Sequence, residues 1–259
     1  MSGPILVLVG LAAGVFAGLF GIGGGVVIVP ALILAAGFPL VKATGTSLAA
    51  ILLPVGILGV LAYHRARIID LRAAVYIACG LAASVAAGAW LANTLPADLM
   101  KKLYAVFLLY VSWNFVDPVR RARRLFGKNA PAKAEPEAPP RLPAYLLVLI
   151  GLVAGVLAGM FGIGGGNIIV PLLAVVFGYP AKRAIATSLA VLLPPVGLPG
   201  VLYYHRAGTL DLGAAAWVAL GLLAGTLVGA KLTIKLPAPT VKLLYGLFLL
   251  FVAARFFIR

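Results

Sequence analysis

The chain has 259 residues, of which 63% are hydrophobic and only 10% are charged. About a quarter of the residues in a soluble domain are charged, and the apolar runs here reach the roughly 20 residues that a membrane span needs. These values exclude an ordinary soluble protein and predict an all-α polytopic membrane protein. A net charge of +15 would suggest nucleic-acid binding in a soluble protein. Here the charges lie between apolar runs, so they indicate orientation in the membrane.

The first apolar run covers residues 4–38 and is interrupted by the sequence FGIGGG at Phe20–Gly25. Each glycine costs a helix about 1 kcal/mol relative to alanine, so three in a row predict a break in the helix. Before the break, Gly10, Gly14 and Gly18 recur every four residues. This spacing gives one helix face a smooth strip, which favours close packing against another helix.

The next segment covers residues 46–63 and opens with Thr46 and Ser47, which suit a helix N-cap and first turn. Pro54 is predicted to kink or break this helix in mid-span. A short polar stretch follows, and apolar segments at 73–95 and 99–116 complete the first half of the chain.

The second half repeats the first at an offset of 141 residues, so that Phe20–Gly25 recurs as Phe161–Gly166. We therefore divide the chain into a first repeat (1–117), a basic Pro/Ala-rich linker (118–141) and a second repeat (142–259). Pro194 and Pro199 are additions of the second repeat, and they predict a more irregular helix there. The pairs that keep the offset include Pro30/Pro171, Thr46/Thr187, Ser47/Ser188, Pro54/Pro195, His64/His205, Arg65/Arg206 and Asp70/Asp211. This is an internal duplication.

The charges predict that the two repeats are inverted with respect to the membrane. The linker carries seven Lys and Arg residues, which places it in the cytoplasm. Arg67 of the first repeat corresponds to Gly208, whereas Trp90 corresponds to Lys231. In both pairs the basic residue belongs to the repeat that an inverted topology turns inward. Inversion requires an odd number of crossings per repeat: five if both arms of the glycine break cross, or three if they form a re-entrant hairpin.

The glycine breaks are the candidate substrate site. Successive backbone N–H groups in a glycine turn form a concave nest, and a helix N-terminus after it adds positive potential, so the site suits an anion. Asn167 stands where the first repeat has Val26, which favours substrate binding nearer the second break. The candidate residues are Gly23, Gly24, Gly25, Thr46, Ser47, Gly164, Gly165, Gly166, Asn167, Thr187 and Ser188. The alternative is that the glycines serve only close helix packing and the threonines only cap helices.

A second group of polar residues lies at segment ends and could form a vestibule or relay protons. Its members are His64, Arg65, Asp70, His205, Arg206 and Asp211. The preferred interpretation is interfacial anchoring together with Tyr63 and Tyr204. The histidines, the carboxylates and the single cysteine show no metal-ligand spacing, and neither a metal nor a cofactor is expected.

A duplicated FGIGGG motif followed by a proline and a TSL sequence resembles the TauE/SafE family of sulfite and organosulfonate transporters. The resemblance rests on Phe20–Gly25 with Pro30 and Thr46–Leu48, and equally on Phe161–Gly166 with Pro171 and Thr187–Leu189. It covers nearly the whole chain apart from the linker. It implies a polytopic carrier of small sulfur-containing or carboxylated anions, without fixing the substrate.

The sequence therefore predicts a secondary membrane transporter, an exporter of small anions such as sulfite, sulfoacetate or other organosulfonates, bound between the repeats. An anion channel, or an importer of a small carboxylate or sulfur oxyanion, is the alternative. An enzyme is not expected, because all six acidic residues lie at or outside segment ends. The expected partners are a small anion, the lipid bilayer and, as an alternative to a monomer, a second copy of the chain. The expected location is the bacterial inner membrane.

Overall fold

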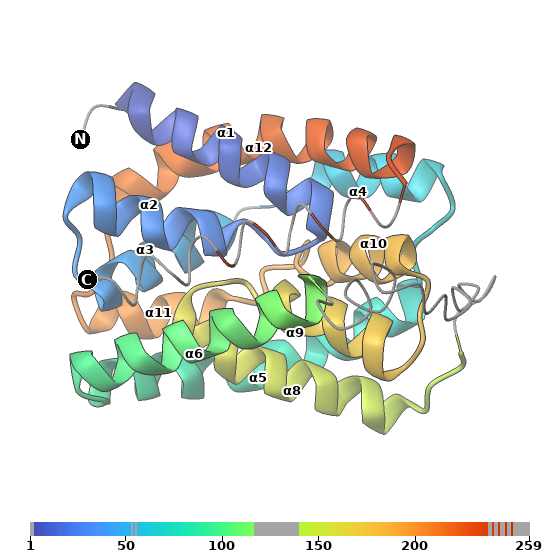
Figure 1. The fold of residues 1–259 in the computed structure, drawn as a ribbon. Coiled ribbons are helices and arrows are strands. Elements are labelled where there is room, and N and C mark those ends of the chain that lie inside the picture. Colours follow the sequence, from blue (N-terminus) through green and yellow to red (C-terminus); the bar gives the residue numbers. More distant parts are fainter. Residues whose placement is uncertain are drawn as a thin grey trace, which may run out of the picture.

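In the computed structural model, the described residues are 3–52, 54, 56–116 and 140–237, with 240, 243, 247 and 250 beyond them. This part of the chain is helical and contains no strand (Figure 1). Most of the predicted linker therefore lies outside the described residues. The first repeat comprises α1 (Gly3–Phe20), α2 (Gly25–Ala36), α3 (Leu40–Leu52), α4 (Ile57–Arg65), α5 (Leu71–Thr94) and α6 (Ala97–Val116). The second comprises α8 (Ala144–Phe161), α9 (Gly166–Pro171), a π-helix (Leu172–Val176), α10 (Ala181–Val191), α11 (Leu198–Arg206) and α12 (Leu212–Lys235).

The first glycine break ends α1 and reverses the chain. Gly21, Gly23 and Gly24 all have positive φ, which L side chains rarely adopt. A Cβ added to Gly24 would lie 3.1 Å from the carbonyl oxygen of Ala13, so the chain folds back along α1. With 12 residues, α2 is only about 18 Å long and cannot cross a 30 Å hydrocarbon core. The two arms therefore differ, since α1 is long enough to cross a membrane alone and α2 is not (Figure 1).

The predicted proline break in the next segment is confirmed. α3 and α4 meet at a bend of 50° near Pro54, and together they form either a broken membrane span or a re-entrant loop. In the second repeat α10 ends at Val191 and α11 begins at Leu198, so this break is longer, as Pro194 led us to expect.

The prediction that Thr46 and Thr187 begin helices is wrong. α3 begins at Leu40 and α10 at Ala181, which places both threonines well inside their helices. The start signal is the preceding proline, Pro180 in the case of α10, whose fixed φ suits the entry to a helix. The threonine side chains are consequently free to bond with neighbouring elements.

The small-residue strips pack helices of one repeat against helices of the other. A Cβ added to Gly10, Gly14 or Gly18 of α1 would overlap the backbone of α12. A Cβ added to Gly151 or Gly159 of α8 would likewise overlap the backbone of α5. The packing interpretation of the first strip is thus confirmed, and the two repeats are interlocked rather than side by side.

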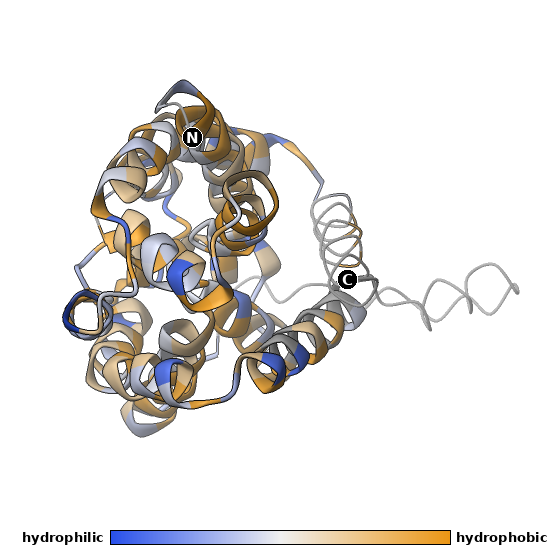
Figure 2. Cartoon of the chain, turned by 90° about the vertical axis from the view of Figure 1, so that its left-hand side faces the viewer, coloured by the Kyte–Doolittle hydropathy of each residue, from blue (hydrophilic) through white to orange (hydrophobic). Residues whose placement is uncertain are grey.

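The repeats run in opposite directions through the bundle. In Figure 1, α1 runs from left to right and α8, its equivalent, from right to left. Such a relation is consistent with inverted repeats around an axis in the membrane plane. Four described helices, α1, α5, α8 and α12, are long and apolar enough to cross a membrane alone. They carry exposed apolar side chains such as Leu8, Val75 and Leu220. Figure 2 shows the hydrophobic colouring spread over the helices of the bundle.

Candidate functional site

The two glycine breaks meet at the contact between the repeats. A Cβ added to Gly23 would lie 3.8 Å from the Cα of Gly164. A Cβ added to Gly25 would overlap the carbonyl of Gly162, and one added to Gly166 would overlap the carbonyl of Gly21. All of these glycines are buried. The folding of the chain thus brings the two predicted glycine runs together, with backbone against backbone.

One carbonyl group at each break accepts a hydrogen bond from a serine. Ser47 Oγ donates to Gly162 O at 2.8 Å, and Ser188 Oγ donates to Gly21 O at 2.7 Å. Each serine thus bonds the break of the opposite repeat. A serine hydroxyl has a single proton to donate, so both protons are committed to these carbonyls.

The breaks also hold the N–H groups of Gly23, Gly24, Gly25, Gly164, Gly165 and Gly166. They lie on the N-terminal side of α2 and α9, where the first backbone N–H groups of a helix have no partner within it. The start of a helix, with such N–H groups, is a place where an anion can bind.

The two threonines tie the broken helices to the opposite repeat. Thr46 Oγ1 accepts from the backbone N–H of Asp211 at 2.9 Å, and Thr187 Oγ1 accepts from that of Asp70 at 3.0 Å. Both threonines are fully buried. Because their oxygens point toward the starts of α12 and α5, they anchor α3 and α10 rather than cover the glycines.

Asn167 follows the second break directly. It is the second residue of α9 and its side chain is only 1% exposed. The equivalent Val26 is also buried. The two breaks therefore differ at this buried position, which is polar in the second repeat and apolar in the first.

The predicted vestibule residues lie at the ends of helices. His64 and Arg65 end α4, His205 and Arg206 end α11, and all four are exposed. The structure does not bring the first His–Arg pair together with the second, since each pair lies at the end of its own repeat's broken helix.

Asp70 and Asp211 are N-caps with different partners. Their carboxylates accept from the backbone N–H of Ala73 and Ala214, both at 3.0 Å. Asp70 also accepts from the hydroxyl of Tyr179 at 3.1 Å, whereas Asp211 pairs with Lys42 at 3.4 Å.

These contacts alter two pKa values. Burial, with the nearby Asp70 carboxylate, raises the pKa of Tyr179 to about 12. The backbone hydrogen bond from Ala214, with Lys42, lowers the pKa of Asp211. Tyr179 therefore stays protonated and Asp211 stays charged at neutral pH. In the described part of the chain, no three His, Cys, Asp or Glu side chains are grouped so as to hold a metal ion.

The interpretation of Tyr63 and Tyr204 as interfacial anchors is wrong. Both side chains are fully buried, and their hydroxyls donate to the carbonyls of Gly18 and Gly159. The close helix approach at these glycines brings the carbonyls within reach of the tyrosines.

Sequence reasoning missed an apolar pair that covers the breaks. Leu192 Cδ1 lies 2.8 Å from a Cβ added to Gly23, and Ile51 lies 3.6 Å from one added to Gly164. The sequence does contain a signal for this pair, since Ile51 and Leu192 keep the repeat offset. Each follows its serine, Ser47 or Ser188, by four residues and so shares its helix face.

Comparison with known proteins identifies the relatives of this arrangement. Residues 6–256 match the family described as sulfite exporter TauE/SafE. The chain belongs to the TauE/SafE family. The match extends over both glycine breaks and both broken helices, and confirms the resemblance that the paired motifs indicate. No solved structure matches the chain.

The curated relatives of this TauE/SafE member are named as probable membrane transporter proteins. YunE of Bacillus subtilis is 26% identical over 98% of this chain and 97% of its own length. A relative from Methanocaldococcus jannaschii is 30% identical over 80% of this chain and 73% of its own length. YdhB of Bacillus subtilis is 28% identical over 92% of this chain and 93% of its own. The family and these names support an integral, multi-pass membrane transporter.

Proposed function

We propose that this TauE/SafE protein is a secondary exporter of small anions, with sulfite, sulfoacetate and other organosulfonates as candidates. The observation that carries the proposal is the meeting of the two glycine breaks, each at the start of a helix, at the contact between the repeats. Serine hydroxyls bond the carbonyls of Gly21 and Gly162, and the first amides of α2 and α9 have no partner within their helices. In a membrane interior, each unsatisfied backbone group costs several kcal/mol. A bound anion accepts from these amides and relieves that cost.

The other candidate residues act in different ways in this proposal. Ser47 and Ser188 hold the breaks in shape, and Thr46 and Thr187 anchor the broken helices to the opposite repeat. Asn167 adds a polar side chain beside the second break, which makes that break the stronger site. The exposed histidines and arginines at the ends of α4 and α11 attract anions from solution.

Export from the cytoplasm suits the energetics of an anion. An inside-negative potential assists an outward-moving anion by about 2.3 kcal/mol per charge per 100 mV. The proposed location is accordingly the inner membrane of a bacterium, and no coupled ion is needed for this direction.

A pair of glycine variants tests the site. Gly164 and Gly178 have similar φ values of 74° and 71°. A Cβ at Gly164 meets only ordinary contacts at 3.6 Å, and one at Gly178 meets nothing within 4 Å. Gly164→Ala and Gly178→Ala should therefore lose similar stability, about 1–2 kcal/mol from the positive φ. Only Gly164→Ala adds bulk where the anion approaches the backbone.

The measurement is the affinity of sulfite, sulfoacetate and simple organosulfonates for purified protein in detergent, alongside thermal unfolding. We expect Gly164→Ala to weaken binding at least tenfold, which corresponds to about 1.4 kcal/mol, and Gly178→Ala to bind like the natural protein. Equal affinity of the two variants for every ligand would place the anion site elsewhere.

A further inference from the structure

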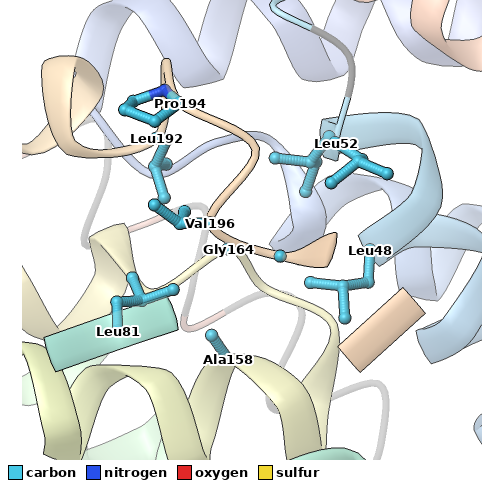
Figure 3. A pocket seen from close by; sticks show the side chains of 10 residues that line it. Leu48, Leu52, Leu81, Ala158, Gly164, Leu192, Pro194 and Val196 are labelled. Atoms are coloured by element: carbon cyan, nitrogen blue, oxygen red, sulfur yellow. The ribbon is translucent and has the colours of Figure 1, made fainter. Parts of the chain in front are cut away.

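The charged side chains of the bundle lie away from its small internal pocket. This pocket, beside Gly164, is lined by apolar side chains such as Leu52 and Leu81 (Figure 3). The basic side chains of α5, α10 and α12 lie instead at or near the ends of these helices. A ligand that these charges recognise therefore binds at an end of the bundle rather than in its interior.

Three helices from the two repeats bring basic side chains to one end of the bundle. Tyr179, just before α10, donates a hydrogen bond to Asp70, just before α5, at 3.1 Å. Lys182 Nζ, in the first turn of α10, donates to the carbonyl of Ile234 near the end of α12 at 3.0 Å. These two contacts gather four residues, hereafter the basic cluster: Arg72, Lys182, Arg183 and Lys235.

The equivalent positions at the opposite end carry less charge. With 24 residues, α12 is about 36 Å long, so Asp211 before its start lies far from Lys235 at its end. At the opposite end Lys42 pairs with Asp211 at 3.4 Å. The positions equivalent to the basic cluster, in the same order, are Gly213, Val41, Lys42 and Thr94. The duplication alone therefore does not account for the basic cluster.

The two arginines of the basic cluster lie near the hydroxyl of Tyr179. Burial raises the pKa of Tyr179, and the positive charges of Arg183 and Arg72 oppose that rise, so both guanidinium groups are close to the hydroxyl. The same hydroxyl donates to one carboxylate oxygen of Asp70, whose other oxygen accepts from the backbone N–H of Ala73 at 3.0 Å. The carboxylate at this end is thus already bonded on both sides.

The basic cluster has no acidic partner of its own. In the described part of the chain, no carboxylate lies within ion-pair distance of any of its four members. The Nε atom of Arg183 is buried and has no hydrogen-bond acceptor there. A buried N–H group of a charged side chain is costly to leave without an acceptor. An acceptor with negative charge from outside the chain would therefore stabilise this end of the bundle.

Exposed apolar side chains border the basic cluster. Leu71 and Val75 lie beside Arg72 on α5 and are 57% and 60% exposed. Ile234, next to Lys235 on α12, is also exposed. A small soluble anion gains nothing from such a surface, whereas the acyl chains of a phospholipid pack against it. Basic residues between membrane helices on the cytoplasmic side bind anionic headgroups in this way, and the charge distribution predicts that this end faces the cytoplasm.

We propose that the basic cluster is a binding site for the phosphate group of an anionic phospholipid. The planar guanidinium groups of Arg72 and Arg183 match the geometry of a phosphate and bind it with paired hydrogen bonds. Lys182 and Lys235 add positive charge around it. The lipid joins the start of α5 to the start of α10 and the end of α12, and so stabilises the contact between the repeats. This binding is separate from the transport proposed above and does not depend on the glycine breaks.

Lipid binding to the purified full-length protein in a neutral detergent tests this site. Native mass spectrometry would measure the affinities of dioctanoyl phosphatidylglycerol and dioctanoyl phosphatidylcholine, which share their acyl chains and differ in net charge. We expect the natural protein to bind phosphatidylglycerol at least tenfold more tightly. Arg72→Gln and Arg183→Gln should each weaken that binding about fivefold, which corresponds to about 1 kcal/mol for one basic residue. Phosphatidylcholine binding should not change.

Two control variants separate a specific site from the general attraction of anions to a protein with a net charge of +15. Arg206→Gln removes one exposed positive charge at the end of α11, shortly before Asp211 at the opposite end. It should leave the affinity for phosphatidylglycerol within twofold of the natural value. Arg183→Lys keeps the charge but removes the planar guanidinium, and the equivalent Lys42 shows that lysine suits this helix position. It should weaken binding at least twofold.

Several outcomes would overturn the proposal. An equal loss in Arg206→Gln and Arg183→Gln would show general attraction and no site. Unchanged affinity in both Arg72→Gln and Arg183→Gln would refute the basic cluster as the place of binding. Glycerophosphoglycerol, the headgroup without acyl chains, tests a soluble ligand, and an affinity equal to that of the lipid would refute a lipid site. If the Arg183 variants do not fold, Arg72→Gln, at an exposed position, decides.

Discussion

At the scale of single residues, two equivalent aspartates of the repeats have different partners in the opposite repeat. Asp70 and Asp211 keep the repeat offset and cap equivalent helices. Their outer partners are Tyr179 and Lys42, which correspond to Phe38 and Arg183 in the other repeat. The sequence predicted a polar group at each aspartate. Its partner could not be predicted, because that partner lies more than 100 residues away in the chain.

Asp211 provides a prediction about pH. Its pKa is lowered in the folded protein by the backbone of Ala214 and by Lys42. Its charge therefore contributes stability above its unfolded pKa of about 3.9, and this contribution is lost as the pH falls through the lower folded value. Asp211→Asn keeps the N-cap but removes the charge. The variant should be less stable than the natural protein at pH 7, and the difference should shrink toward pH 3.

The measurement is thermal unfolding in detergent across this pH range. Asp211→Ala should lose about 1 kcal/mol through loss of the cap itself. Asp70→Ala is the matched cap loss in the first repeat, where the lysine partner is missing. An Asp211→Asn deficit that stays constant from pH 7 to pH 3 would contradict a role for the charge.

At the scale of helices, the sequence predicted which helices exist better than it predicted where they begin and end or which helices they pack against. The glycine and proline breaks were predicted because the backbone cost of these residues is local. The start of α3 was misplaced because Thr46 and Ser47 carry the composition of an N-cap. In the structure their hydroxyls bond the opposite repeat instead. Local signals cannot distinguish a hydroxyl that caps its own helix from one that bonds a distant backbone.

The close contact of α1 with α12 can be tested with two glycines of α12. A Cβ added to Gly221 would overlap the carbonyl of Val7, whereas one added to Gly213 meets only a side-chain oxygen at 3.5 Å. Gly221→Ala should therefore push the helices apart and cost about 1–3 kcal/mol, the usual range for overpacking. Gly213→Ala should be neutral or stabilising, because alanine is the better helix former.

Thermal unfolding of the two variants under identical detergent conditions provides the measurement. The control shares the helix, the substitution and the membrane environment with the test variant. Equal stability of the two would show that the small-residue strip is not a tight seam.

At the scale of the whole molecule, the structure gathers basic residues of both repeats at one end. Tyr179, just before α10, contacts Asp70 at the start of α5. Lys182 in the first turn of α10 donates to the carbonyl of Ile234 near the end of α12 at 3.0 Å. These two contacts bring Arg72, Arg183 and Lys235 to the same end as the start of α5. The charge counts in the sequence predicted this grouping, and the direction of α8 relative to α1 agrees with it.

The interlocking of the repeats was beyond the reach of the sequence. The offset of 141 residues shows that the halves are equivalent, but two equivalent halves can pack side by side or exchange helices. The small-residue strip of α1 predicted a tight partner without naming it. Only the three-dimensional arrangement shows that α1 packs on α12 and α8 on α5. The serine-to-carbonyl contacts depend on this exchange.

Membrane sidedness is the remaining test of the inverted arrangement. Arg67 and Gly208 occupy equivalent, exposed turns after α4 and α11, and both have positive φ, at 55° and 67°. Single cysteines at these positions, in a Cys79→Ala background, would be labelled with a membrane-impermeant thiol reagent in oriented vesicles. Removal of Cys79 is needed because it is exposed on the natural protein.

We expect the cysteine at position 67 to react only from the cytoplasmic side and the one at position 208 only from the opposite side. The reason is that an odd number of crossings per repeat turns equivalent turns to opposite faces, and the basic end faces the cytoplasm. Both cysteines should react equally once detergent opens the vesicles, which controls for local accessibility. Labelling of both positions from one side would contradict inverted repeats. It would also leave the opposed directions of α1 and α8 in the bundle unexplained. The outcome therefore decides both the topology of the repeats and the orientation of the export path.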